Sequence, residues 1–179
     1  MGSDREGGWS AMPITNPQEK FVHALGLLYD AEQRFLEGQQ QMMEQATDGE
    51  LQGMLQTHID ESRQQVQNLE QVFGQMGQEP QRVTSDAAQG LVSDAQKSLQ
   101  EAQEAGPLAD TLIADAQAKV EHFEIACYRA LVVGAKQMGQ DEAVNLLQQN
   151  LRQEEQTAAN IEQSTPKLVQ KSMQSAASS

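Results

Sequence analysis

Four long segments of the chain carry an apolar residue at every third or fourth position, and this spacing limits the fold class. In the first segment the apolar stripe contains Phe21, Leu25, Leu28, Phe35 and Met42. Steps that alternate between three and four residues place these side chains on one face of an α-helix that packs against other helices. Because three further segments show the same spacing, we predict an all-α fold built on a four-helix bundle.

Capping residues, glycine and proline mark where the predicted helices begin and end. Asn16 before Pro17 and Glu19 predicts the start of the first helix, and Thr47 with Glu50 predicts the start of the second. The predicted long helices cover residues 17–46, 48–76, 107–138 and 141–165, and a weaker helix covers 85–105. The short connections within the first and the last pair make each pair antiparallel. The weaker helix is therefore an additional helix in the crossover between the pairs.

The same signals divide the chain into one folded domain and two flanking segments. We expect a disordered leader at residues 1–15, a helical bundle at 16–165 and a flexible C-terminal tail at 166–179. The leader is rich in glycine and lacks a hydrophobic signal core. Thr165 and Pro166 end the last helical pattern, and the small residues that follow are expected to fray.

Charge and cysteine content narrow the environment and the partners of the protein. The chain has 12 Lys and Arg against 26 Asp and Glu, a net charge of −14. Such a chain repels phosphates and anionic membrane surfaces, so we expect no nucleic acid and no membrane as partners. The single Cys127 allows no internal disulfide and is typical of a reducing compartment, so we expect a cytoplasmic protein.

Acidic residues lie near the middle of all four long helices. Glu32 and Glu154 occupy positions in the apolar stripes, and Glu61 lies beside the stripe of its helix. Glu121 and Glu124 are three residues apart, so they share one helix face. The midpoints of helices of similar length coincide in a bundle, whichever way each helix runs. We therefore predict that these five carboxylates converge at one level.

The convergence of the acids predicts a metal site. A single Glu in an apolar stripe can be tolerated by hydration, and a single His such as His58 is usually a core histidine with hydrogen-bond partners. Five acids without a Lys or Arg in the stripes would instead take up protons or bind cations. Carboxylates from four facing helices are a known arrangement for two iron or manganese ions. The predicted ligands of this dinuclear iron or manganese site are Glu32, His58, Glu61, Glu121, Glu124 and Glu154.

The sequence also resembles a known family. Its motifs are LYDAE at 28–32, HIDES at 58–62, LEQVF at 69–73, AQAKVEHFEIA at 116–126, LL at 146–147, and Leu151 with EE at 154–155. In these motifs the chain is similar to the ferritin-like family of bacterial stress proteins typified by YciE and YciF, over about residues 17–161. The resemblance implies a ferritin-like bundle, a dimer and an association with stress responses. We therefore expect a homodimer, which the many small residues in the stripes also favour.

The sequence departs from the wider ferritin-like pattern at two ligand positions. That pattern has Glu-x-x-His on two bundle helices, but here Glu61 is followed by Gln64 and Glu154 by Thr157. A site with mostly oxygen ligands is harder and less selective than one with two imidazoles. This departure weakens the case for oxidase chemistry more than the case for metal binding.

Two functions are compatible with these observations. The first is a dimetal-carboxylate stress protein that binds iron or manganese, with redox activity towards peroxide or oxygen. The second is a non-enzymatic bundle that acts in stress protection or interaction and keeps a vestigial metal site. A DNA-protecting relative of ferritin conflicts with the charge of −14. The sequence assigns no catalytic residue and leaves open whether the protein is an enzyme.

Overall fold

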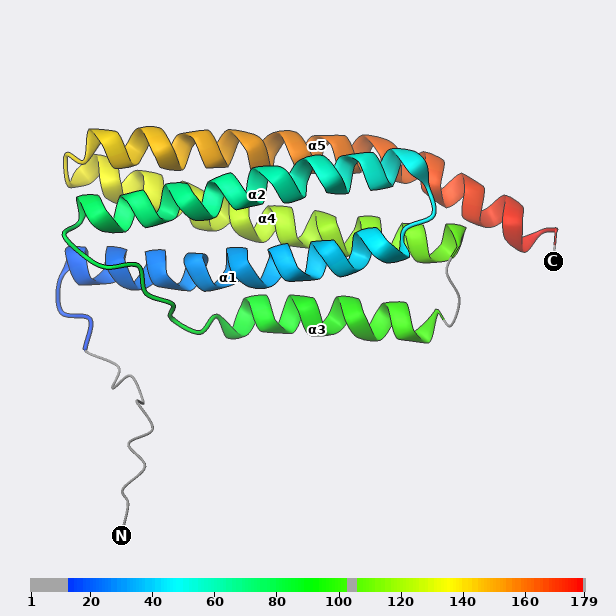
Figure 1. Cartoon of the computed structure of the whole chain (residues 1–179), viewed down its shortest axis with the longest axis horizontal. Helices are drawn as coiled ribbons and strands as arrows, with labels where there is room; N and C mark the ends of the chain where they lie inside the picture. The colour runs from blue at the N-terminus through cyan, green and yellow to red at the C-terminus, as the bar shows by residue number, and fades with distance from the viewer. Residues whose placement is uncertain (1–12, 103–105, 179) are drawn as a thin grey trace, which may run out of the picture.

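The computed structural model describes residues 13–102 and 106–178, and it contains five helices (Figure 1). The helices are α1 (Pro17–Gln45), α2 (Gly49–Gln75), α3 (Asp86–Glu101), α4 (Pro107–Gln137) and α5 (Asp141–Ala176). The described residues include no β-strand. The predicted all-α fold is therefore confirmed. Most of the predicted leader, residues 1–12, lies outside the described part of the chain, and so does the predicted end of the crossover helix.

Four of the helices form the bundle, and the fifth lies on its outside. α1 packs on α2 and α4, while α5 packs on α2 and α4, which closes a four-helix arrangement. α3 lies along α1, on the side away from α2, and contacts both α1 and α4 (Figure 1). The prediction of a ferritin-like four-helix bundle with an additional helix in the crossover is thus confirmed.

The turn between α1 and α2 differs from the predicted capping arrangement. Asp48, not Thr47, is the N-cap of α2, and its carboxylate accepts hydrogen bonds from the backbone N–H groups of Glu50 (3.0 Å) and Leu51 (3.1 Å). Thr47 instead donates its backbone N–H and its hydroxyl to Asp110 of α4, each at 2.7 Å. The Thr47 side chain therefore ties this turn to α4 and is not free to cap α2.

A buried carboxylate fixes the crossover to α1. Asp30 is 2% exposed, and it accepts hydrogen bonds from Arg34 (2.7 Å), from Arg82 (2.9 Å) and from the backbone N–H of Ser85 (2.9 Å). Arg82 and Ser85 lie just before α3, so one side chain of α1 sets where the crossover helix begins. A buried charge with three donors, two of them cationic, is a stable arrangement.

The predicted end of the last helix at Thr165 and Pro166 is wrong. α5 continues through Pro166 to Ala176 and extends beyond the end of the bundle (Figure 1). Leu168 is buried, Lys167 forms an ion pair with Glu50, and Lys171 forms one with Asp48. These contacts with the start of α2 hold the last turns in place although proline removes one helical hydrogen bond. Local sequence signals did not reveal them.

The apolar core is divided into two clusters along the bundle. One cluster includes Leu25, Leu28 and Leu131, and the other includes Leu55 and Ile113. Polar and acidic side chains lie between them. No helix among the described residues is long and apolar enough to span a membrane. Among the described residues, the large exposed apolar side chains are one before α1, two on α4 and two on α5: Ile14, Leu108, Val133, Val169 and Met173. The homodimer stays a prediction.

Candidate metal centre

The layer between the two apolar clusters contains side chains from all four bundle helices. α1 contributes Glu32, α2 contributes His58, α4 contributes Glu121 and Glu124, and α5 contributes Glu154. Each of these side chains is at most 1% exposed. The level match predicted from the helix midpoints therefore holds for four of the five acids, and it brings the histidine to the same level.

Four of these residues form a compact group. His58, Glu121, Glu124 and Glu154 each offer one ligand atom, and these atoms all lie within 4.8 Å of one another. Glu121 and Glu124 both reach the group because a three-residue step returns to the same side of α4. A group of this size and composition can hold a metal ion between its ligand atoms.

The imidazole of His58 lies between two carboxylates of the group. Its Nε2 atom is 3.1 Å from Oε1 of Glu121 and 4.0 Å from Oε2 of Glu154. Neither imidazole nitrogen has a partner with hydrogen-bond geometry. His58 is therefore placed as an ion-pair partner or a ligand, and it is not the core histidine with satisfied hydrogen bonds that a single His on an apolar face would usually be.

Glu61 lies apart from this group. Its side chain is 31% exposed, and its recorded contact is with the outer nitrogen of His58, Nδ1, at 3.9 Å. The i,i+3 spacing of His58 and Glu61 brings the two side chains together, as the sequence indicated. Glu61 lies near Nδ1 of the imidazole, however, whereas the other acids lie near Nε2. The structure thus places Glu61 in reach of His58 and outside the buried carboxylates.

A tyrosine holds Glu32 at the edge of the group. The buried Tyr128 of α4 donates its hydroxyl hydrogen to Oε1 of Glu32. The same hydroxyl accepts a hydrogen bond from Nδ2 of Asn150 on α5 (3.0 Å), and Oδ1 of Asn150 accepts one from Asn68 on α2 (2.7 Å). A chain of hydrogen bonds therefore links one acid of the layer to all four bundle helices.

Sequence reasoning missed these supporting polar residues. Gln117 donates to Glu121 one helical turn further along α4, and Tyr128 and Asn150 fix Glu32 as described. The usable signal was that Gln117 lies four residues before Glu121, and Asn150 four residues before Glu154, each on the same face as the acid. The sequence alone gives no reason to separate such residues from exposed glutamine and asparagine, which are abundant in this chain.

Most of the acid oxygens in the layer have no hydrogen-bond partner. Both oxygens of Glu124 and both of Glu154 are buried without one, and so is one oxygen each of Glu32 and Glu121. Buried carboxylate oxygens are normally paired, because leaving one unpaired is unfavourable by about 1–3 kcal/mol or more. Six such atoms in one layer therefore call for protons or a cation.

Burial and mutual repulsion shift the pKa values of the acids upward. Burial raises the pKa of Glu32 to about 7, although the hydrogen bond from Tyr128 opposes the shift. Burial and then the charge of Glu32 raise the pKa of Glu124 well above its usual value, and burial and then the charge of Glu124 do the same for Glu154. These acids are thus poised to hold protons when no cation is present.

His58 and Glu121 shift in the opposite sense as a pair. Burial alone would lower the pKa of His58, but the neighbouring carboxylates, Glu121 first and then Glu61 and Glu32, together outweigh burial and raise the pKa to about 9. Burial alone would raise the pKa of Glu121, but the charge of His58 and the polar groups around the carboxylate, including Gln117, together hold this pKa below its usual range. At neutral pH the pair is therefore an imidazolium and a carboxylate, beside two acids whose pKa values are raised.

The chain is similar to a family of known proteins over most of its length. Residues 16–174 match the model of a protein family described as a domain of unknown function, DUF892. The protein YciF of Escherichia coli strain K12 is 27% identical over 147 residues, which are 82% of this chain and 88% of YciF.

Solved structures agree with the fold. The crystal structure of the E. coli stress protein YciF aligns with a TM-score of 0.82 and 26% identity, over 88% of this chain and 99% of that chain. YcfI from Rhodopseudomonas palustris aligns with a TM-score of 0.81 and 32% identity, over 86% of this chain and 98% of that chain. The chain therefore belongs to the DUF892 family and is homologous to the E. coli stress protein YciF.

Proposed function

We propose that this YciF-like protein binds a pair of iron or manganese ions in the buried layer, as part of a role in the stress response. The observation that carries the proposal is the set of buried acid oxygens without partners on Glu124 and Glu154, next to an imidazole without hydrogen bonds. A bound cation would satisfy these atoms together and remove the repulsion between them.

The donor set fits hard divalent ions with one imidazole. Glu32, Glu121, Glu124 and Glu154 would supply oxygen ligands, and His58 would supply one nitrogen ligand after losing its proton. Gln117 and Tyr128 would orient Glu121 and Glu32 through their hydrogen bonds. When bound, a pair of such ions would supply redox chemistry towards peroxide or dioxygen.

Metal content measured on the purified protein tests the proposal. The full chain is stripped with a chelator, loaded with Fe(II) without oxygen or with Mn(II), desalted and analysed for metal. We expect about two ions per chain and a higher midpoint of thermal unfolding in the loaded protein, because the unfolded chain does not gather the ligands. Glu124→Gln with Glu154→Gln should lower the metal content at least tenfold.

The matched control is Glu155→Gln, because Glu155 neighbours Glu154 on α5 but is exposed and pairs with Arg129. This variant should retain its metal. If wild-type protein takes up neither ion, or if the double variant binds as much as the control, the metal-binding function is wrong.

A further inference from the structure

One carboxylate beside the acid layer is open to solvent. The four acids of the layer are each at most 1% exposed, so an ion in water does not reach them without a movement of the protein. The side chain of Glu61 is 31% exposed, and its Oε2 atom lies 3.9 Å from Nδ1 of the buried His58. Among the six residues predicted to form the site, Glu61 therefore provides the contact between solvent and the layer.

Glu61 lies at the seam between α2 and α5. Gln65, further along α2, donates a hydrogen bond to Gln153 of α5 at 3.3 Å, so this side of α2 faces α5. Glu61 is four residues before Gln65 and therefore shares its helix face. An ion that binds Glu61 is thus already next to the two helices that contribute His58 and Glu154.

The negative charge of Glu61 is not neutralised by a cationic side chain in the described part of the chain. Its recorded contact is with the imidazole, and Arg63, two residues further along α2, pairs with Asp60 at 2.6 Å. By contrast, the exposed Glu155 on α5 lies 2.7 Å from Arg129. A cation in solution is attracted to an acid that has no cationic partner, on a chain whose net charge is −14.

The distances around the imidazole match the size of a coordinated metal ion. Metal bonds to nitrogen and to carboxylate oxygen are about 2.0–2.2 Å long, so two ligand atoms about 4 Å apart can hold one ion between them. Glu61 Oε2 and His58 Nδ1 are 3.9 Å apart, and Nε2 of the same ring is 4.0 Å from Oε2 of Glu154. Each ring nitrogen thus faces a carboxylate oxygen across a gap that one ion can fill.

The imidazole nitrogens are available for this purpose. Neither has a partner with hydrogen-bond geometry, although buried polar atoms are normally paired. No hydrogen bond therefore opposes a rotation of the His58 side chain. A neutral imidazole has one free lone pair, so the ring binds an ion at Nδ1 or at Nε2 and not at both. An ion at Glu61 and an ion among the buried acids would use the ring in succession.

We propose that Glu61 and Nδ1 of His58 form an entry site, through which a divalent cation passes from solvent to the buried acids. The entry site serves the proposed metal-binding function and rests on it. The ion exchanges bound water for the Glu61 carboxylate and for Nδ1, and it moves to the carboxylates near Nε2 when the His58 side chain turns. Glu61 is not a ligand of the filled centre, so it sets the rate of filling and not the amount of metal that is held.

An entry residue has a kinetic signature. An ion crosses the entry site in both directions, so removing the site raises the barrier for uptake and for release equally and leaves the Kd unchanged. A carboxylate that only orients His58 would act differently. Its loss would weaken the bond between the metal and the imidazole, speed release and raise the Kd.

Rates of metal uptake by the metal-free full chain test the entry site. Mn(II) uptake is followed by the loss of the EPR signal of the free ion, and Fe(II) uptake without oxygen by desalting at set times and metal analysis. Release is followed after addition of excess chelator. We expect Glu61→Gln to slow uptake and release at least about fivefold each, with about two ions per chain at equilibrium, as in the wild type. Uptake should also depend less on salt, because a charge that attracts the ion is gone.

The matched control is Asp60→Asn. Asp60 precedes Glu61 on α2 and has the same charge, but it is exposed and pairs with Arg63. This variant should fill and empty at the wild-type rates. Glu61→Lys, which reverses the charge at the entry site, should slow uptake more than Glu61→Gln does. Circular dichroism confirms the fold of each variant.

The outcomes separate the entry site from the function on which it rests. If the wild type binds neither ion, the metal-binding function is wrong and so is the entry site. If the wild type fills but Glu61→Gln takes up metal at the rate of Asp60→Asn, the entry site is wrong and the metal centre stands. A higher Kd with faster release in Glu61→Gln would show that Glu61 orients His58, and it would also overturn the entry site.

Discussion

The hydroxyl of Tyr128 on α4 donates a hydrogen bond to Glu32 on α1 inside the acid layer. Both side chains are buried, so Tyr128→Phe leaves an oxygen of Glu32 without a partner. We expect the substitution to lower the free energy of unfolding by about 1–3 kcal/mol, measured by urea denaturation of the metal-free protein. The control is Tyr29→Phe, which removes an exposed hydrogen bond to Glu70 and should change stability by less than about 1 kcal/mol.

The stability of the metal-free protein should fall as pH rises from about 5 to about 9. Glu32 has a folded pKa of about 7, raised above its ordinary value of 4.5, so its contribution to stability is full below pH 4.5 and is lost as pH rises through 7. His58 has a folded pKa of about 9, raised above 6.5, so its contribution is full below 6.5 and is lost as pH rises through 9. Urea denaturation across this pH range, with chelator present, measures how steeply the free energy of unfolding falls with pH.

One variant separates the two contributions to this pH dependence. His58→Gln should remove the contribution of the imidazole between about pH 6.5 and 9. It should also increase the contribution of the acids, because the charge of His58 lowers the pKa values of Glu32 and Glu121. The raised pKa values of Glu124 and Glu154 act in the same direction as that of Glu32. Stability that rises with pH across this whole range would contradict the assignment of buried, mutually repelling acids.

The crossover packs closely on α1 at Gly26, so this position should not accept a larger side chain without a loss of stability. A Cβ at Gly26 would lie 2.7 Å from Cγ2 of Val83 and 3.2 Å from the backbone oxygen of Gln81. Val83 N–H also donates to the Gly26 carbonyl at 3.1 Å. Gly26→Ala should therefore lower the free energy of unfolding by about 1–3 kcal/mol, although alanine is the better helix former.

Gly53→Ala provides the comparison for this prediction, because open space surrounds Gly53 in α2. It should raise the free energy of unfolding by about 0.5–1 kcal/mol. Equal stabilisation by both substitutions in chemical denaturation would show that the segment before α3 is not packed on α1 in solution.

The extension of α5 beyond Pro166 predicts a contribution of the last turns to stability. Leu168 is 2% exposed, so Leu168→Ala should lower the free energy of unfolding by about 2–3 kcal/mol. Val169 is 42% exposed, and Val169→Ala should change it by less than about 0.5 kcal/mol. Thermal or urea denaturation compares the two. A small effect of both would mean that the helix frays after Pro166.

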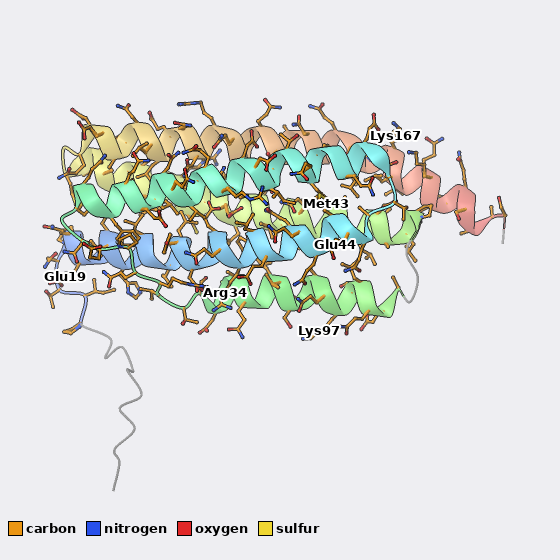
Figure 2. All side chains as sticks on the ribbon, viewed as in Figure 1. Glu19, Arg34, Met43, Glu44, Lys97 and Lys167 are labelled. Atoms are coloured by element: carbon orange, nitrogen blue, oxygen red, sulfur yellow. The ribbon has the colours of Figure 1, made fainter. Side chains whose placement is uncertain are left out.

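The helices of the bundle were predictable because their signals are local. The helix α1 can be identified from Asn16, Pro17 and the spacing of its apolar residues. The carboxamide oxygen of Asn16 accepts a hydrogen bond from the backbone N–H of Glu19, as predicted. The end of α5 was not predictable, because Lys167 and Lys171 meet partners more than a hundred residues away. Figure 2 shows Lys167 on α5 near the end of the bundle where α2 begins. Long-range contacts override local helix-ending signals there.

The position of the candidate site along the bundle was predictable from the sequence, but the set of residues that form it was only partly predictable. Glu121 and Glu124 could be grouped because a three-residue step keeps them on one helix face. Glu61 occupies the same face of α2 as His58, but its carboxylate lies near Nδ1 of the imidazole, on the side away from the other acids. Helix rotation about its own axis decides such cases, and it depends on packing with neighbouring helices, which the sequence pattern does not resolve.

The acid layer between two apolar clusters also fixes the longitudinal register of the bundle. Apolar stripes of Leu, Ala and Val repeat along every helix, so sliding one helix by a turn would still pair apolar with apolar side chains. His58 and Glu121 come within 3.1 Å in one alignment. Sliding α2 by one turn would leave a buried charge among leucines, such as Leu55, which is strongly unfavourable. A layer that costs stability within the folded state thereby excludes the alternative alignments that a uniform apolar core would permit.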